Sequence, residues 1–549
     1  MLRNAVISAL VILTVVFAIF VGLGFSPDDI QRLFAHPISG GPEATAPMLA
    51  PSQPRPSSPA ALKTPDFAVI IVYLALMLGI GAIIGRNVKT TRRFFLADGN
   101  ANFVFVGLSL LATYLSALTM MALPGMSFSR HDLTYAIQLP CLIITAAVIT
   151  GWVLPRYRDA GVVSVYQFLE QRIHVSLRLV ASVSFLIFAI GRMGLVLYLP
   201  ALAFNTVSGL PLEPAIIGMG VVITIYTMAG GIEAVIWTDV IQAVIFILGA
   251  LLSLAYVFAD VGVEQFLAIG ESAHKFRWFI PGAELGKITS LWLVLETIFQ
   301  TIRIYGTEQD LAQRYMTTSS TDRANRSVWI SILLYIPLGF IFYFLGVALF
   351  VYYQANPDAG IPFDKPDRIY PYFIVHRLPA GVAGFVIAAI FAAAMSTISS
   401  LMNSASTVCV EDFLKRLGHR LRSDQEHLWW AKGLTLLWGC LHIGMALLFT
   451  EIAFAQIVWQ KLMGICTNGI LGLLVLALLP WRLRPAAVVA GFVLSYEALV
   501  FMIYFDDVIC FLLWPVIGNL TCVVGALVCH VLFAALAKRP CAGSDGAKP

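Results

Sequence analysis

The chain has 549 residues, of which 59% are hydrophobic and only 12% are charged. Soluble proteins carry about 25% charged residues, so this composition excludes a soluble enzyme with one anchor, a disordered scaffold and a secreted disulfide-rich protein. The net charge of +4 is small and no long basic run concentrates it, which argues against a nucleic-acid partner. The chain is long enough for many helices of about 20 residues, each spanning a lipid bilayer.

The N-terminal region differs in composition from the rest of the chain. In residues 1–24, Arg3 precedes an apolar segment, 5–24, which fits either a retained extra helix or a cleaved signal peptide. No small-x-small cleavage site is visible after this segment, which favours the retained helix. Residues 25–65 contain a Pro/Ala/Ser-rich stretch that cannot bury a core, so we expect an extended external linker there.

Apolar windows predict an all-α, polytopic membrane protein with about 13–14 transmembrane helices. After the segment 5–24, the predicted spans are 67–86, 103–128, 133–154, 178–203, 212–229, 236–258, 289–306, 328–353, 381–409, 431–452, 460–481, 486–504 and 508–536. We expect residues 66–537 to form one domain in the lipid bilayer, followed by a short cytoplasmic tail, 538–549.

The basic residues predict the orientation of these spans. Clusters of Lys and Arg follow every even-numbered span except the sixth, whose return loop is very short; one cluster holds Arg314, Arg323 and Arg326. Cytoplasmic loops carry such an excess of basic residues. The pattern therefore predicts a multi-pass protein of the inner (plasma) membrane, with both termini in the cytoplasm if residues 1–24 are retained.

The span 103–128 holds polar and helix-breaking residues that an ordinary membrane helix does not need. Ser116 and Thr119 lie in its middle, and Pro124 and Gly125 lie near its outer end. A broken helix at this depth frees backbone carbonyls, which are ligands for an alkali cation where protein or a watery cavity surrounds them. The alternative is a proline kink, with hydroxyls that bond back to their own helix.

The span 381–409 contains the run FAAAMSTISSLMNSAST, with hydroxyls at Ser396, Thr397, Ser399 and Ser400. Small and hydroxyl residues occur at any helix–helix interface. Four hydroxyls within five residues, however, point in several directions around the helix, more than one packing face needs. Because hard cations prefer oxygen ligands, the run favours a cation site.

Two ionisable residues inside predicted spans are candidates for function because charge in lipid is costly. Asp239 lies near the start of the span 236–258, as either a charge facing cytoplasmic water or a cation ligand. Arg192 lies in the middle of 178–203, and its fork of donors suits a carboxylate. Arg192 either contacts a substrate or forms a structural ion pair, for which Glu296 is a candidate partner. Gln138 offers an amide nearby if the two helices meet.

The sequence contains no motif of a known enzyme class. It has no HExxH, GxSxG, Walker or kinase signature, and its nine histidines and eight cysteines form no ligand cluster. We therefore expect a protein that is not an enzyme.

Three segments resemble the sodium:solute symporter family. They are IYTMAGGIEAVIWTDVIQ (225–242), AAIFAAAMSTISSLMNS (388–404) and EQDLAQRYM (308–316), and the resemblance extends over roughly residues 67–536. Within that family, three further segments look like the bacterial sialic acid symporters: ATYLSALT (112–119), VSVYQFLEQRIHVSLRLVASVSF (163–185) and LGVALFVYYQANP (345–357). The resemblance implies a core of ten helices in a five-plus-five inverted repeat, with ligands bound where helices break at the membrane midplane.

The same resemblance assigns roles to residues of this chain. Backbone carbonyls and hydroxyls would hold one sodium ion, at Ala112, Leu115, Ala393, Ser396 and Thr397. A carboxylate and hydroxyls would hold a second ion, at Asp239, Ser396, Ser399 and Ser400. Polar side chains would bind the substrate, at Ser116, Thr119, Gln138 and Arg192.

The chain also departs from the sialic acid branch. It has Ala117 where that branch has a second serine, and it adds Glu296 and Arg303, seven residues apart. Glu296 and Arg303 either neutralise each other or add an acid-binding cation to the pocket. These departures bear on the identity of the substrate more than on sodium coupling.

We therefore expect sodium-coupled symport of a small organic solute across the plasma membrane, with one or two Na⁺ ions as co-transported ligands. The expected solute is a carboxylate such as sialic acid or a related sugar acid. One alternative is a neutral sugar or amino acid, with Arg192 paired internally. Another is a symporter-like sensor, which the short segment 538–549 disfavours.

Overall fold

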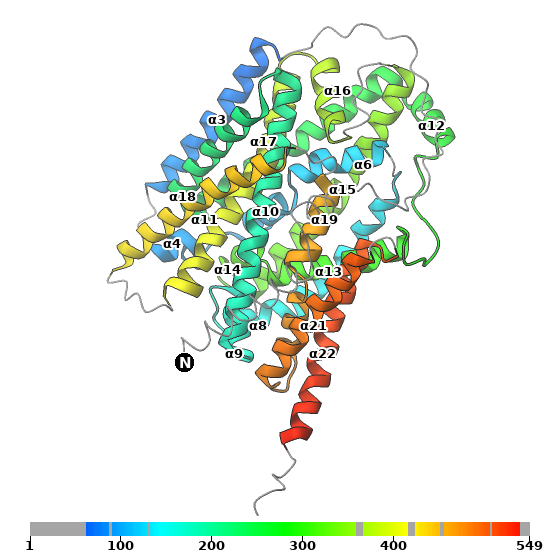
Figure 1. Cartoon of the computed structure of the whole chain (residues 1–549). Helices are drawn as coiled ribbons and strands as arrows, with labels where there is room; N and C mark the ends of the chain where they lie inside the picture. The colour runs from blue at the N-terminus through cyan, green and yellow to red at the C-terminus, as the bar shows by residue number, and fades with distance from the viewer. Residues whose placement is uncertain are drawn as a thin grey trace, which may run out of the picture.

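The computed structural model describes residues 62–86, 90–129, 132–357, 366–415, 423–450, 455–505 and 508–537. In this part of the chain every regular element is a helix, which confirms the all-α class (Figure 1). Helices α3 (Thr64–Gly85) and α18 (Asp424–Leu448) lie on one flank, and α21 (Pro485–Tyr504) and α22 (Trp514–Ala537) lie on the other. The extra helix predicted in 1–24, nearly all of the linker and the tail 538–549 lie outside the described residues.

Nine helical segments in the described ranges are long and apolar enough to cross a membrane. Besides α3, α18 and α21, they are Thr134–Asp159, built from η3 (Thr134–Cys141), α7 (Leu142–Val148), η4 (Ile149–Val153) and α8 (Leu154–Asp159); α10 (Val175–Ser208); α11 (Leu212–Val261); α15 (Thr321–Ala355); α17 (Val382–Val408) with η6 (Cys409–Leu414); and η7 (Phe511–Leu513) with α22.

Two bent pairs make further, broken spans. The first is α5 (Phe103–Tyr114) with η2 (Leu118–Ala122) and α6 (Leu123–Ser129), and the second is α19 (Ala455–Cys466) with α20 (Ile470–Leu478). Helix α13 (Ser290–Thr307) corresponds to the predicted span 289–306. The shorter elements are α4 (Thr91–Leu96), η1 (Ala97–Gly99), α9 (Val165–Arg172), α12 (Val263–Ser272), α14 (Gln309–Met316), η5 (Pro366–Arg368) and α16 (Ile369–Arg377).

The long helix α11 covers two predicted spans, 212–229 and 236–258. The two halves are separated by one residue, Gly231, whose backbone has φ 57° and ψ −163°. A side chain at this position would also collide with its surroundings, because a Cβ would lie 2.7 Å from a ring atom of Phe94 and 2.8 Å from its carbonyl oxygen. The very short return loop expected there is therefore a glycine break.

The break in the span 103–128 lies upstream of the predicted position. The sequence placed it at Pro124 and Gly125, but the helix is interrupted between Tyr114 and Leu118, where the axis bends by 55°. Side chains stabilise the interruption, because the Leu118 amide donates to Ser116 Oγ (3.2 Å) and the Ser116 amide donates to Thr119 Oγ1 (3.3 Å). Pro124 instead lies inside the outer segment, α6, so a proline kink does not explain the bend.

Helix α17 lies at the centre of the bundle. All residues from 386 to 408 are buried, as expected for a helix surrounded by other helices. Helix α17 packs against α3, α5, α10, α11 and α18, and the interrupted end of α5 faces its middle. The fold therefore brings freed backbone carbonyls next to the hydroxyl-rich run of α17.

Candidate functional site

A cluster of uncharged oxygen atoms lies where the end of α5 meets α17. The last carbonyls of α5 have no partner further along the helix because the helix stops at Tyr114. Ser396 Oγ donates to the carbonyls of Ala112 (3.0 Å) and Ala393 (3.1 Å). Thr397 Oγ1 donates to the carbonyls of Ala393 (3.3 Å) and Thr113 (3.4 Å). We refer to these carbonyl and hydroxyl groups as the oxygen cluster.

The oxygen cluster joins four of the five residues that the sequence assigned to a first sodium site: Ala112, Ala393, Ser396 and Thr397. The fifth, Leu115, caps the end of α5 in an extended conformation, with ψ 117°. Thr113 is an additional member that sequence reasoning missed. If the end of the helix had been predicted at Tyr114 rather than near Pro124, Thr113 would have been recognised as a residue with a freed carbonyl.

A charged group lies one helical turn further along the same face of α17, where Ser400 also contacts Thr113 Oγ1 (3.4 Å). Asp239 Oδ2 accepts from Ser109 Oγ (2.6 Å) and forms an ion pair with Arg314 Nη2 (3.0 Å). Arg314 also donates to Ser109 Oγ (2.8 Å) and to the hydroxyl of Ser400. The side chains of Asp239 and Arg314 have no exposed surface in the structure.

These contacts correct two expectations. Asp239 does not face cytoplasmic water at the start of a helix, because α11 continues past it and Arg314 covers it. Arg314, counted among the cytoplasmic basic residues, is likewise buried. Of the predicted second sodium site, Arg314 connects Asp239 with Ser400, while Ser399 Oγ donates to the carbonyl of Ser396 (3.2 Å).

Arg192 forms ion pairs, but not with the predicted partner. Its Nη1 lies 2.7 Å from Glu308 Oε2 and 3.3 Å from Asp310 Oδ2, both at the start of α14, and its guanidinium lies 5.0 Å from the Trp459 ring centroid. Glu308 also pairs with Arg303 through Oε1 (2.8 Å). Glu296, the candidate partner from the sequence, makes no ion pair with either arginine in the described ranges.

Helix α14 carries the acidic partners that sequence reasoning missed. It is short and hydrophilic, yet Gln309, Asp310, Gln313 and Arg314 have no exposed surface. Gln309 bonds to the backbone of Val163 and Val165, while Gln313 bonds to side chains of α17 and to the carbonyl of Phe95. The sequence did contain a signal for these partners. In a short segment between spans, Glu308 and Asp310 precede Arg314 by six and four residues.

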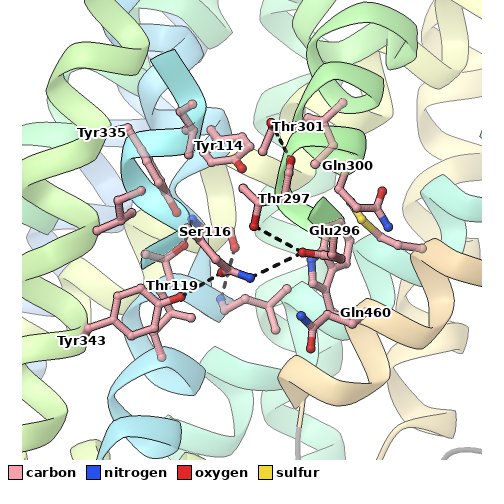
Figure 2. A pocket seen from close by; sticks show the side chains of 18 of the residues that line it. Tyr114, Ser116, Thr119, Glu296, Thr297, Gln300, Thr301, Tyr335, Tyr343 and Gln460 are labelled. Carbon is pink, nitrogen blue, oxygen red and sulfur yellow. Dashed lines mark hydrogen bonds between the residues drawn. The ribbon is translucent and has the colours of Figure 1, made fainter. Parts of the chain in front are cut away.

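A cavity of about 110 Å³ opens beside the break in α5 (Figure 2). All four residues predicted to bind substrate line it: Ser116, Thr119, Gln138 and Arg192. Aromatic side chains from three helices form much of the remaining wall: Tyr114, Tyr335, Tyr343 and Trp459. The segment 112–119 therefore contributes carbonyls to the oxygen cluster and hydroxyls to the cavity.

Glu296 also lines this cavity, close to Thr297 (Figure 2). Gln138 Nε2 donates to Glu296 Oε2 over 3.4 Å, and Thr297 Oγ1 donates to the same oxygen over 3.4 Å. The sequence offered two roles for Glu296 and Arg303, and the geometry supports neither. Arg303 pairs with Glu308 and lies outside the cavity lining.

Known proteins match this chain over most of its length. Residues 94–493 match the family profile described as "Sodium:solute symporter family". The chain belongs to this family. The symporter is 31% identical to the sodium/sialic acid symporter SiaT of Proteus mirabilis, over 85% of this chain and 95% of that protein. It is 30% identical to the human sodium-coupled monocarboxylate transporter 1, over 78% of this chain and 72% of that protein.

A solved structure agrees with these matches. A Na⁺-coupled sialic acid symporter in a substrate-bound, outward-open state superposes with a TM-score of 0.78 at 31% identity, covering 86% of this chain and 98% of that one. The symporter is therefore a multi-pass membrane protein with the fold of this transporter class, and Na⁺ is its co-transported ion. Its family and relatives are transporters rather than enzymes.

Proposed function

We propose that the symporter imports a small organic carboxylate, such as sialic acid or a related sugar acid, driven by the sodium gradient. The geometry of Arg192 is the observation that supports this proposal. Both of its ion pairs use the same nitrogen, Nη1, so the other nitrogens remain available to a substrate. In the described part of the chain, Nε and Nη2 bond to no acceptor, and Arg192 lines the cavity. A guanidinium with two free donors suits a carboxylate, and the nearby Ser116, Thr119 and Gln138 suit the hydroxyls of a sugar acid.

The oxygen cluster is the proposed primary sodium site. Its ligands would be the carbonyls of Ala112 and Ala393 and the hydroxyls of Ser396 and Thr397, together with the carbonyl of Leu115 at the end of α5. Na⁺ is a hard cation that favours oxygen ligands, and carbonyls freed by a broken helix at mid-membrane provide them without a buried charge. Support for this assignment comes from the two hydrogen bonds that join α5 to α17 at this point, from Ser396 to the Ala112 carbonyl and from Thr397 to the Thr113 carbonyl.

A second Na⁺ would bind at Asp239, Ser396, Ser399 and Ser400. Asp239 has one oxygen, Oδ1, that is buried without a hydrogen-bond partner among the described residues, which leaves an acceptor for a cation. Arg314 already bonds to Asp239 and Ser400. Binding of a second ion would therefore require the ion and the guanidinium to share Asp239.

Sodium and substrate would be coupled through the segment 112–119. An ion in the oxygen cluster would hold the end of α5 against α17, which fixes Ser116 and Thr119 at the cavity wall. A substrate that needs those hydroxyls in place binds more tightly when the ion is present, and by linkage the ion binds more tightly when the substrate is present.

We also propose that both termini, with residues 1–24 retained, lie on the cytoplasmic side of the inner membrane.

Uptake into proteoliposomes tests this function. Labelled N-acetylneuraminic acid should enter vesicles only with an inward sodium gradient. Arg192→Ala should lose about 2–5 kcal/mol of substrate binding, a loss of about 30-fold or more, because the carboxylate loses its charged partner. Sodium-dependent thermal stabilisation of the variant shows that the protein is folded.

One observation favours a second function, symport of a neutral sugar or amino acid. Arg192 is already paired with two acids, Glu308 and Asp310. If Arg192→Ala keeps the uptake of the substrate, the arginine is structural, and the neutral-substrate function replaces the one proposed.

A further inference from the structure

The charges next to the cavity are not balanced. Arg192 and Arg303 pair with Glu308 and Asp310, so two positive and two negative groups compensate each other. Glu296 is a fifth ionisable group beside the cavity. Its side chain is only 7% exposed, and within the described residues it forms no ion pair.

The hydrogen bonds of Glu296 also leave it incompletely satisfied. Its two bonds, from Gln138 and Thr297, are long at 3.4 Å, and both go to Oε2. The other oxygen, Oε1, has no donor in the described part of the chain. Oε1 is not fully buried either, so it borders open space rather than packed protein.

Among the described residues, no basic side chain forms an ion pair with Glu296, and only the charge of Arg303 acts on it from a longer distance. Arg192 is the one basic residue among those lining the cavity in the described ranges, and its nearest acids are Glu308 and Asp310. Arg303 donates to Gln300 and Glu308. A buried carboxylate without a counterion is unfavourable, and a ligand that brings a cation into the cavity removes this cost.

We propose that the substrate carries an ammonium group as well as its carboxylate, and that Glu296 binds this ammonium. The proposal rests on the proposed function, in which Arg192 receives the carboxylate, and it makes sugar acids that also carry an ammonium better substrates than plain anions such as N-acetylneuraminic acid. With such a substrate, each end of the molecule meets a charge of opposite sign. A plain anion would instead add a second negative charge next to Glu296.

Two matched pairs of ligands test the inference on the full-length protein. The first pair is N-acetylneuraminic acid and its 9-amino-9-deoxy analogue; the second is D-gluconate and D-glucosaminate. In each pair one hydroxyl is replaced by an ammonium. Affinity is measured by sodium-dependent thermal stabilisation, and uptake by competition in proteoliposomes.

The decisive variant is Glu296→Gln, which removes the charge and keeps the shape of the side chain. In the wild type, the amine member of at least one pair should bind about tenfold more tightly than its hydroxyl partner. Glu296→Gln should abolish this preference, because the amine member loses its partner and binds more weakly, while the hydroxyl member no longer meets a second negative charge and binds at least as tightly as to the wild type. Glu213→Gln, the same change at an exposed site at the start of α11, should have no effect.

Each contrary result has one meaning. Equal binding of both members by the wild type overturns the inference and leaves the carboxylate function intact. An amine preference that survives in Glu296→Gln overturns the role of Glu296. If none of the four acids binds in sodium, the carboxylate function itself fails, and the inference fails with it.

Discussion

Two polar regions follow one another along the face of α17 that carries Ser396 and Ser400, and they differ in charge. The oxygen cluster contains only carbonyls and hydroxyls, contributed by α5 and α17. The region around Asp239 contains a buried ion pair with Arg314, contributed by α11 and α14. The neutral oxygen cluster suits a cation that binds and dissociates. In the buried ion pair the guanidinium of Arg314 is already the cation, and the pair holds two helices together.

The energetic consequence of a substitution should differ between the regions. Removal of one partner from a buried ion pair leaves an uncompensated charge, which destabilises a protein by about 3–5 kcal/mol. Removal of one hydroxyl from a neutral cluster leaves only uncharged carbonyls, and an unpaired carbonyl costs less than an uncompensated buried charge. The charged region should therefore be needed mainly for folding, and the oxygen cluster for the affinity of the first sodium ion.

The largest effect is expected for Arg314→Met, which leaves Asp239 unpaired. We expect a loss of about 3–5 kcal/mol in the free energy of unfolding, measured by denaturation in detergent at neutral pH. The control is Arg326→Met, because the pair that Arg326 forms with Asp322 is exposed, with side-chain exposures of 62% and 69%. That control should lose at most about 1 kcal/mol.

The double variant Asp239→Asn/Arg314→Met sharpens this test. Removal of both charges should restore most of the stability lost in the single variant, because no charge remains buried alone. Equal stability of Arg314→Met and Arg326→Met would show that Asp239 is not held by its ion pair.

A smaller effect, confined to sodium, is expected for Ser396→Ala. Loss of one oxygen ligand should raise the sodium concentration for half-maximal uptake about tenfold, equivalent to about 1.4 kcal/mol. Ser406→Ala is the matched control, since Ser406 lies on the same helix but bonds to the Met402 carbonyl and to Thr435. Unchanged sodium activation in Ser396→Ala would contradict the assignment of the oxygen cluster to Na⁺.

An effect of similar size concerns a third kind of site, a buried carboxylate outside both regions. Burial raises the pKa of Asp367, in η5, to about 6, although the Ala455 amide donates to it and lowers the pKa in part. Because the folded state holds this proton more tightly than the unfolded state, whose carboxyl has a pKa near 3.8, stability should fall by about 1–2 kcal/mol as the pH rises from 4 through 6.

Asp367→Asn should remove this pH dependence because the amide does not titrate. The measurement is the melting temperature of the variant and the wild type between pH 4.5 and 7.5. Asp322→Asn, at an exposed position, should retain the slope of the wild type. A slope that persists in Asp367→Asn would assign the titration to another group.

The spans and the oxygen cluster were predictable because their signals are local. Each predicted span from 67–86 onward corresponds to a helix, a helix pair or one half of α11. The hydroxyls of Ser396 and Thr397 lie within one helix, and only their meeting with Ala112 required knowledge of the family.

The charged contacts were not predictable because their partners are distant in sequence. Asp239 and Arg314 are 75 residues apart, and Arg192 and Glu308 are 116 apart. No periodicity joins such residues, so Glu296 was the wrong candidate partner for Arg192. The break in α5 was misplaced for a different reason: Ser116 and Thr119 satisfy the interrupted backbone, while proline is accommodated inside α6.

Helix α14 has the hydrophilic composition of a surface loop but the burial of a core element. Any state that opens this end of the molecule must therefore exchange the bonds of Gln309 and Gln313 for bonds to water. Hydration would drive the opening, and dehydration would drive the closure. The rate of transport should therefore depend on osmotic stress. Solutes that are excluded from the protein surface should slow the step in which water reaches α14.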